Sequence, residues 1–336
     1  MMSLPKCFQH IDFNETGGPD VLKMSSSPMP SIKSHQVLIK VAAAGVNGPD
    51  IVQRNGIYPA PSNASAVLGL EVSGIISDVG DQVTDWTIGD HVCALVPGGG
   101  YSEYVVTSSS HCLPIPSQLS FIEAAALPET FFTVWGNLFM RAGLKKEETL
   151  LIHGASGGLG NCAMLLAKAF GAKVIVTAGN DEKTQHCLDI GADHAFNYHD
   201  DMLLSKITQL TMDKGVDVVF DMAAGDFVNL NLKVLKEDGR MVTVALQRGA
   251  KANIDIFRLM AKRITWTGST LRPQPDASKA IIAQQLRKHV WPLFSHKKLT
   301  PYINATFPLA EASSAHKLLE SGKNKGKIVL NVSKLS

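Results

Sequence analysis

The stretch LLIHGASGGLGNCAMLLAKAFGAKVIVTAG, from Leu150 to Gly179, determines how the middle of the chain folds. An apolar run, LLIH, comes before the glycines, and an amphipathic segment predicted as a helix from Asn161 to Phe170 follows them. Gly158 adds flexibility to a G-x-x-G-x-x-G pattern made by Gly154, Gly157 and Gly160. This is a variant of the dinucleotide fingerprint, in which bare backbone amides at a helix start receive a pyrophosphate. A glycine-rich turn without a ligand is the alternative.

Strands and helices alternate from this stretch toward residue 271. Apolar runs such as AKVIVTAG, VDVVFDMA, GRMVTVAL and ITWTGST are separated by segments of helical length. This alternation predicts an α/β fold with a doubly wound parallel sheet covered by helices on both faces. Before about residue 120, short strands between Gly, Pro and Asp clusters predict a mostly β unit.

Three further segments are predicted as helices. They are ETFFTVWGNLFMRAGL, which Gly143 ends, SKAIIAQQLRKHVWPLF and EASSAHKLLESG. A last strand, KIVLNV, follows near the end of the chain.

Composition limits the function classes. The 336 residues favour two domains, and the formal net charge of +2 argues against a polyanionic partner such as nucleic acid. No window reaches the roughly 18 uninterrupted apolar residues of a membrane span, and the first residues lack the apolar core of a signal peptide, so we expect a cytoplasmic protein. Five cysteines at scattered spacings predict free thiols rather than disulfides or a zinc finger.

The end of the second strand bears on the choice of dinucleotide. Ala178, Gly179 and Asn180 are small and uncharged, and Lys183 follows, which favours NADP because an ammonium attracts the 2′-phosphate. Asp181 leaves NAD open, since an acid at this distance from the glycines also suits ribose hydroxyls. Its place in a first helical turn is also typical of a cap.

Nearly the full length resembles the zinc-free medium-chain dehydrogenase/reductases, in their quinone oxidoreductase (zeta-crystallin-like) branch. The motifs that carry the resemblance are AAAGVNGPDIVQRNGIYPAP, LGLEVSGIISDVG, GGGYSEY, HGASGGLG, TAG…K and FNY, in that order. The resemblance implies a GroES-like catalytic domain from residues 1–126 and 272–336, with a Rossmann NADP-binding domain, residues 127–271, inserted in it. It also implies a homodimer or a tetramer.

The resemblance assigns site residues by motif. Around the nicotinamide it implies Asn47, Tyr58 and Thr133. Under the pyrophosphate it implies Ser156, Gly157, Gly158 and Leu159, and at the adenosine 2′-phosphate Gly179, Lys183 and Tyr198. Later cofactor contacts would come from Ala223, Leu246, the stretch from Ser269 to Leu271, Asn324 and Lys327.

Departures from the zinc-bearing relatives predict a site without metal. Asn47 stands where those enzymes carry Cys, and Leu70 stands where they carry His. An amide and an isobutyl group do not replace thiolate and imidazole. The loop with four cysteines is absent too, because Pro97–Gly100 runs straight into Tyr101. Val52 replaces a second Tyr of some members, which affects the substrate pocket.

Without a metal, the expected reaction is transfer of a hydride from NADPH to a quinone or to the β-carbon of an enone, acceptors that spread the incoming charge over their own π system. Tyr58 is the candidate hydrogen-bond donor or proton source, with packing as its alternative. The Asn47 amide would fix the nicotinamide or a substrate oxygen, and otherwise Asn47 forms a turn. Reduction of a 2-enoyl thioester, and a crystallin-type or RNA-binding role with little catalysis, remain open.

Several other residues have structural explanations. Glu71 is predicted as a buried carboxylate that bridges backbone and an Arg, and His153 as a packing or cofactor-adjacent group. Cys93 and Cys112 are predicted as core thiols. Self-association is expected at the sheet edge, where ITWTGST and IVLNV would be edge strands that need cover.

Overall fold

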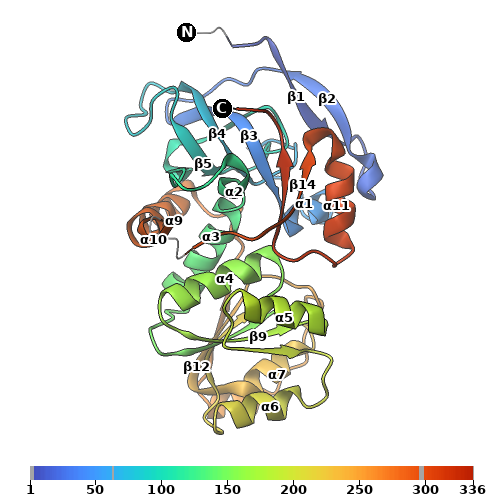
Figure 1. Cartoon of the computed structure of the whole chain (residues 1–336), viewed down its shortest axis with the longest axis vertical. Helices are drawn as coiled ribbons and strands as arrows, with labels where there is room; N and C mark the ends of the chain where they lie inside the picture. Colours follow the sequence, from blue (N-terminus) through green and yellow to red (C-terminus); the bar gives the residue numbers. More distant parts are fainter. Residues whose placement is uncertain (1–3, 63, 295–298, 336) are drawn as a thin grey trace. The chain divides into compact units, whose positions relative to one another are not determined.

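The computed structural model describes residues 4–62, 64–294 and 299–335. Two compact units divide the chain: unit 1 consists of Met1–Phe132 with Arg272–Ser336, and unit 2 of Thr133–Leu271 (Figure 1). The first boundary lies inside helix α3 (Pro128–Val134), a few residues past the predicted break after residue 126. The roles predicted for the two domains stay predictions.

Unit 2 is built on a six-stranded sheet in the order β10-β9-β8-β11-β12-β13, and every pairing in it is parallel. Its strands are β8 (Thr149–His153), β9 (Lys173–Ala178), β10 (His194–Asn197), β11 (Val216–Asp221), β12 (Leu235–Thr243) and β13 (Thr265–Gly268). Relative to β8, the chain first proceeds one way across the sheet and then the other, which is the doubly wound dinucleotide-binding order. The predicted fold class is confirmed.

Helices connect these strands and cover the sheet. They are α4 (Gly158–Ala169), α5 (Asp181–Asp189), α6 (Leu203–Leu210), α7 (Phe227–Val234) and α8 (Ile256–Ala261). Because right-handed crossovers proceed in opposite directions from β8, they place helices on both faces. Figure 1 shows α4 to α7 around β9 and β12.

Two helix predictions in unit 2 need correction. α4 begins at Gly158, inside the glycine run, rather than at Asn161. The glycines tolerate helical geometry there, so the first free amides of the helix belong to residues 158–160. The segment predicted as one helix near residue 135 is α3 followed by a π-helical stretch, η3 (Trp135–Arg141). Such stretches are rare and are frequently found at functional sites.

Unit 1 is mostly β. One sheet has the order β14-β15-β3-β4-β5-β7, with β6 also pairing β3, and β1 and β2 form a separate pair. The strands are β1 (Cys7–Asp12), β2 (Lys23–Pro28), β3 (Gln36–Val46), β4 (Glu71–Val79), β5 (His91–Leu95), β6 (Tyr104–Ser108), β7 (Cys112–Pro114), β14 (Ile303–Pro308) and β15 (Lys327–Asn331). β15 lies between β14 and β3, so the prediction of IVLNV as an edge strand was wrong. The sequence of β14 had given no clear strand signal.

Helices of unit 1 are α1 (Gly48–Arg54), α2 (Phe121–Ala124), α9 (Asp276–His289), α10 (Trp291–Phe294) and α11 (Ala312–Glu320). Three single turns, η1 (Pro19–Val21), η2 (Ser109–His111) and η4 (Leu309–Glu311), complete it. The predicted single helix SKAIIAQQLRKHVWPLF is broken into α9 and α10 at Val290. Pro292 explains the break, since its ring clashes with the preceding turn and it has no N–H to donate.

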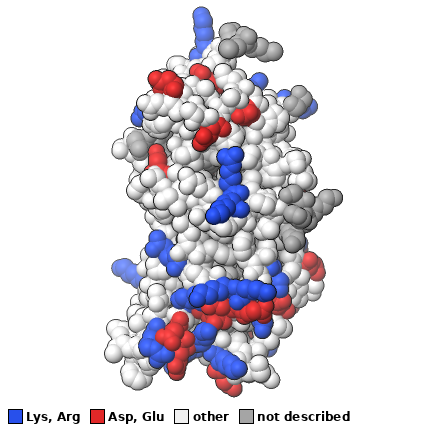
Figure 2. Space-filling model, turned by 90° about the vertical axis from the view of Figure 1, so that its left-hand side faces the viewer, with Lys and Arg blue, Asp and Glu red and all other residues white. Residues whose placement is uncertain are grey.

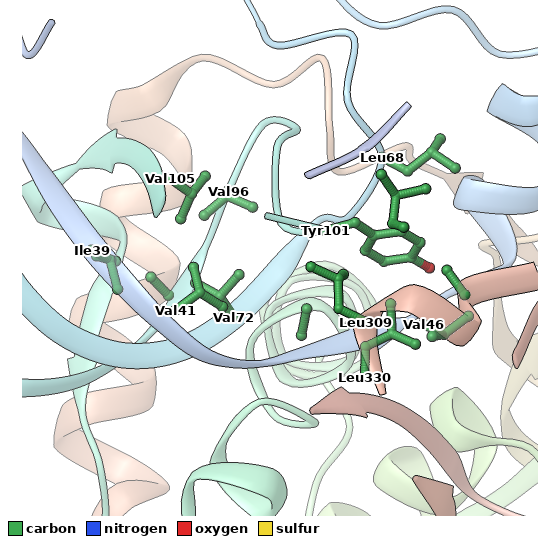
Figure 3. Packing of buried hydrophobic residues seen from close by; sticks show 14 of the residues in the cluster. Ile39, Val41, Val46, Leu68, Val72, Val96, Tyr101, Val105, Leu309 and Leu330 are labelled. Atoms are coloured by element: carbon green, nitrogen blue, oxygen red, sulfur yellow. The ribbon is translucent and has the colours of Figure 1, made fainter. Parts of the chain in front are cut away.

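The core of unit 1 lies between the sheet and α11. Val41, Val72 and Leu330 come from neighbouring strands and are fully buried. Figure 3 shows them in one cluster with Leu309 and the ring of Tyr101. The sheet is therefore fixed by apolar packing next to a buried phenol that needs polar partners.

Charged side chains of both signs lie next to each other on the face shown in Figure 2, where a row of basic side chains in the lower part has acidic side chains directly beneath it. Within the described ranges, no helix has the length and apolar character that a membrane crossing requires.

Candidate active site

The glycine turn between β8 and α4 presents bare backbone at the head of a helix. Gly154 has a φ of 68°, a conformation that favours glycine, and Gly157 is the N-cap of α4. A Cβ on Gly160 would lie 2.5 Å from Cα of Ala155, so only glycine allows the helix to pack this closely on the turn. Above Gly157 a Cβ would meet nothing nearer than 4.0 Å. A dinucleotide pyrophosphate fits this open cradle.

The turn that follows β9 carries Gly179, which is predicted to bind the adenosine 2′-phosphate together with Lys183 and Tyr198. A Cβ on Gly179 would lie 2.7 Å from the hydroxyl oxygen of Tyr198, so the missing side chain lets the phenol cover the turn. Asn180 caps α5, because its side chain accepts a hydrogen bond from the backbone N–H of Lys183 at 2.9 Å. Asp181 follows the cap and accepts from the Asn197 amide at 3.3 Å. The structure thus places Tyr198 against Gly179 and ties the Lys183 backbone to Asn180, and it corrects the cap from Asp181 to Asn180.

The ends of β11 and β12 lie side by side at the same sheet edge. The Asp221 carboxylate is fully buried and accepts from the backbone N–H groups of Ala223 and Ala224 at 3.0 and 2.9 Å. It also accepts from the Thr243 hydroxyl at 3.0 Å, which ties the two strands. Ala223 is thereby held in a fixed turn, while Leu246 is 55% exposed beyond β12. In open parallel sheets, ligands bind at this edge.

Asn137 connects two more of the predicted cofactor residues. Its amide donates to the backbone carbonyl of Thr133 at 2.9 Å, and it accepts from the Ser269 hydroxyl at 2.7 Å. Asn137 is buried in the π-helical stretch, and Leu271 is buried a short distance along the chain. Sequence reasoning missed Asn137, although a polar residue on the apolar face of FFTVWGNLF was a usable signal.

A second cluster lies in unit 1, where three strand ends meet. β3 pairs with both β4 and β15, so the register places the end of β3 beside the beginnings of the other two. Asn47 follows β3, Glu71 begins β4 and Lys327 begins β15. The Asn47 amide donates to the Glu71 carboxylate at 2.9 Å and accepts from the Lys327 ammonium at 2.7 Å. The ammonium and the carboxylate form a direct ion pair, and the Glu71 side chain is fully buried.

This cluster corrects the prediction for Glu71. Glu71 bridges to Lys327 rather than to an Arg, and its backbone partner is the N–H of Glu129, at 2.9 Å. The Asn47 amide is occupied by protein partners, and its backbone N–H donates to Asp50 at 2.8 Å where α1 begins. Asn47 is thus the N-cap of α1, and its role at the nicotinamide stays a prediction. The buried Asn324 amide donates to the carbonyl of Gly326 at 3.3 Å.

A buried chain of polar groups extends from this cluster to α11. Asp50 accepts from the Tyr101 hydroxyl at 2.9 Å, and that oxygen lies 3.1 Å from His316. His316 contacts Arg54, which pairs with Glu320 at 2.5 Å. Burial raises the pKa of Asp50 to about 6, and burial together with Arg54 lowers the pKa of His316 to about 3. None of these residues was singled out from the sequence.

Tyr58 follows α1 and keeps part of its surface exposed. The Arg272 guanidinium lies over its ring, 5.8 Å from the centroid. Burial raises the pKa of the Tyr58 hydroxyl, the positive charge of Arg272 opposes that rise, and the Glu129 carboxylate adds to it. A partly exposed phenol next to a cation suits hydrogen-bond donation or proton transfer.

The remaining candidates are structural. His153 is buried between Thr177 and Asn231, at 2.9 and 2.7 Å, and burial lowers its pKa. Cys93 and Cys112 are buried, as predicted for core thiols, and burial raises their pKa. Among the residues that the structure describes, no group of three or more His, Cys, Asp or Glu side chains is placed to hold a metal ion.

Comparisons with known proteins agree with this geometry. The family model "Alcohol dehydrogenase GroES-like domain" matches residues 33–117, and "Zinc-binding dehydrogenase" matches residues 158–284. Quinone oxidoreductase of Rattus norvegicus is 35% identical, covering 97% of this chain and 98% of its own.

Two solved structures share the fold over nearly the whole chain. Escherichia coli quinone oxidoreductase complexed with NADPH has a TM-score of 0.86 at 29% identity, covering 96% of this chain and all of its own. CurK enoyl reductase also has a TM-score of 0.86, at 28% identity, covering 98% of this chain and all of its own. The chain therefore belongs to the medium-chain dehydrogenase/reductase family, alongside quinone oxidoreductases, and is an NAD(P)H-dependent oxidoreductase.

Proposed function

We propose that the protein is an NADPH:quinone oxidoreductase that needs no metal and passes a hydride to a quinone or another conjugated carbonyl acceptor. The observation that carries the proposal is the bare glycine cradle at the head of α4 in unit 2, and the partly exposed Tyr58 next to Arg272 is a separate observation in unit 1. The quinone oxidoreductase relatives support the choice of acceptor. Bound NADPH supplies the hydride.

The residues of this chain perform binding and proton transfer. Amides at the start of α4 and the helix dipole bind the pyrophosphate. The buried Glu71–Lys327 pair fixes Asn47 and the beginning of α1, and thereby the loop that carries Tyr58. The Tyr58 hydroxyl donates to the acceptor oxygen as negative charge develops there.

The direct test measures NADPH oxidation with 1,4-benzoquinone, 9,10-phenanthrenequinone, a small enone and a 2-enoyl thioester. Turnover with a quinone or enone supports the proposal, whereas tight NADPH binding without turnover of any acceptor refutes it. The resemblance to an enoyl reductase makes thioester reduction the second candidate. A kcat/KM that is highest for the thioester would select that activity instead.

Cofactor choice depends on the end of β9. We propose NADPH, because Lys183 lies in the first turn of α5, shortly after Gly179, and the Tyr198 hydroxyl covers Gly179. Replacing Lys183 with Ala should weaken NADPH binding about 10-fold, the effect of losing one hydrogen bond between charged groups, and leave NADH binding unchanged. Fluorescence titration with both cofactors checks this. Lys173→Ala, at the other end of β9, is the matched control, and equal losses for both cofactors would count against Lys183.

A homodimer is proposed at the β13 edge of unit 2. β13 has a strand neighbour on one side only among the described strands, and Trp266 on it is 38% exposed. Phe257 on α8, the helix that precedes β13 in the chain, is 78% exposed. An open strand edge and exposed large apolar side chains both call for cover. Sedimentation should give a dimer for the native protein and a monomer for Phe257→Glu. Met212→Glu, at a residue elsewhere in unit 2 that is 73% exposed, should stay dimeric. A native monomer would exclude this interface.

A cytoplasmic location is proposed with this function. All five cysteines are free, and four of them are buried, which suits a reducing compartment. Cell fractionation checks it, and recovery in an oxidising compartment would contradict it. Nucleic acid is not a proposed partner, since acidic and basic side chains are interspersed on the face in Figure 2.

A further inference from the structure

We infer that Arg272 is a positioning residue for the reduction and that its positive charge acts on the acceptor through the Tyr58 ring. The acceptors that this arrangement suits are those whose reduction places negative charge on an oxygen beside Tyr58. The inference rests on the proposed function. The guanidinium lies 5.8 Å from the centroid of the Tyr58 ring, within the range of a cation–π contact.

The Arg272 side chain is held in place from two sides. Its Nε donates to the carbonyl of Pro97 at 2.8 Å, and its Nη1 donates to the side-chain oxygen of Gln53 at 2.7 Å. Gln53 is itself anchored, because its amide donates to the carbonyl of Ala66 at 2.7 Å. Only 6% of Arg272 is exposed. The cation therefore keeps one position relative to the loop that carries Tyr58.

In the described part of the chain, no carboxylate pairs directly with the positive charge of Arg272. Among the described residues, no carboxylate lies within ion-pair distance of it, and its buried Nη2 has no hydrogen-bond partner. A Cβ on Gly98 would lie 3.2 Å from Nη2, so a larger residue there would crowd the guanidinium. A buried, unpaired cation is costly for stability. Because this cation lies against the Tyr58 ring, its charge can stabilise an anion that forms beside the ring.

Among the charged groups near Tyr58, Arg272 has the largest electrostatic effect on the Tyr58 hydroxyl at neutral pH. Burial lowers the pKa of Arg272, and the charges of Asp50 and Glu129 oppose that shift. Lys279 lies within electrostatic range of both Arg272 and Glu129. Burial, reinforced by the charge of Glu71, raises the pKa of Glu129 to about 8. Glu129 is therefore mostly neutral at pH 7, although part of its surface is exposed. The charge that Tyr58 experiences most directly is then that of Arg272.

The chemistry follows from this arrangement. The hydride brings two electrons to a carbon or oxygen of the acceptor, and negative charge accumulates on the acceptor oxygen. The O–H bond of Tyr58 breaks as a new O–H bond forms on that oxygen, leaving a tyrosinate that Arg272 stabilises. Water then returns a proton to the tyrosinate. An acceptor that does not develop an oxygen anion gains nothing from Arg272.

The test compares Arg272→Met, which removes the charge, with Arg272→Lys, which keeps it. Ultraviolet titration of the NADP-loaded proteins, with Tyr58→Phe subtracted, gives the pKa of Tyr58. Arg272→Met should raise this pKa by about one pH unit and lower kcat about 10-fold, and Arg272→Lys should restore most of both. Arg287→Met is the matched control, because that guanidinium lies 5.9 Å over the Trp86 ring and should leave Tyr58 unchanged.

A variant that moves the pKa the other way guards against misfolding of Arg272→Met. Glu129→Gln removes a group that raises the pKa of Tyr58, so it should lower that pKa. An unchanged Tyr58 pKa in Arg272→Met, or equal losses in Arg272→Lys, would overturn the inference. The titration needs no turnover, so it is informative even if no acceptor is reduced, a result that would refute the proposed function alone.

Discussion

Replacing Tyr58 with Phe is expected to lower kcat for quinone or enone reduction about 100-fold, the lower range of what one positioned proton donor contributes. The hydroxyl is the only group removed, so NADPH binding and stability should change little. Stopped-flow measurement of NADPH oxidation at saturating acceptor checks the rate. Fluorescence titration checks that the cofactor still binds.

Tyr104 offers the matched control for this variant. It is a second partly exposed tyrosine of unit 1, on β6, and burial raises its pKa as it does for Tyr58. Tyr104→Phe should retain the native kcat. A Tyr58→Phe enzyme with native kcat would show that the phenol only packs, and proton delivery would then have to come from solvent.

Replacing Lys327 with Met is expected to lower the free energy of unfolding by about 3–5 kcal/mol, because it leaves the Glu71 carboxylate buried without a cation. Asn47 and the Glu129 N–H remain as hydrogen-bond donors to that carboxylate, but neither carries a charge. Urea denaturation measures the change.

Two further variants test whether the loss of stability comes from the buried Glu71–Lys327 pair. One removes an exposed ion pair, and the other removes both buried charges. Lys317 pairs with Asp20 on the surface, so Lys317→Met should cost at most about 1 kcal/mol. Combining Lys327→Met with Glu71→Gln should recover part of the loss, since the buried charge disappears. A Lys327→Met protein as stable as Lys317→Met would mean that the pair does not hold the strand ends together.

Local patterns predicted unit 2 well. The strand before Gly154 and the spacing of the glycines are properties of adjacent residues, and the doubly wound sheet follows from the alternation around them. The start of α4 was misplaced because glycine has low helix propensity, and the packing of Gly160 on Ala155 overrides it. Pro292 was itself a local signal for the break between α9 and α10, but the apolar periodicity of the segment favoured one continuous helix.

The polar clusters of unit 1 could not be predicted in this way. Glu71 and Lys327 are 256 residues apart, and Arg272 and Gln53 are 219 apart. Only the pairing of β3 with β4 and β15 brings the first pair together. A sequence shows that Glu71 is flanked by apolar residues, which predicts burial, but not whether a Lys or an Arg compensates it.

The most direct test of metal-free hydride transfer is an isotope experiment with chelator-treated protein of measured zinc content. NADPH deuterated at C4 of the nicotinamide is oxidised with a small enone, and the product is analysed by mass spectrometry and NMR. Our account predicts undiminished turnover without zinc and one deuterium at the β-carbon of the product. Turnover that depends on added zinc, or a product without the label, would contradict it.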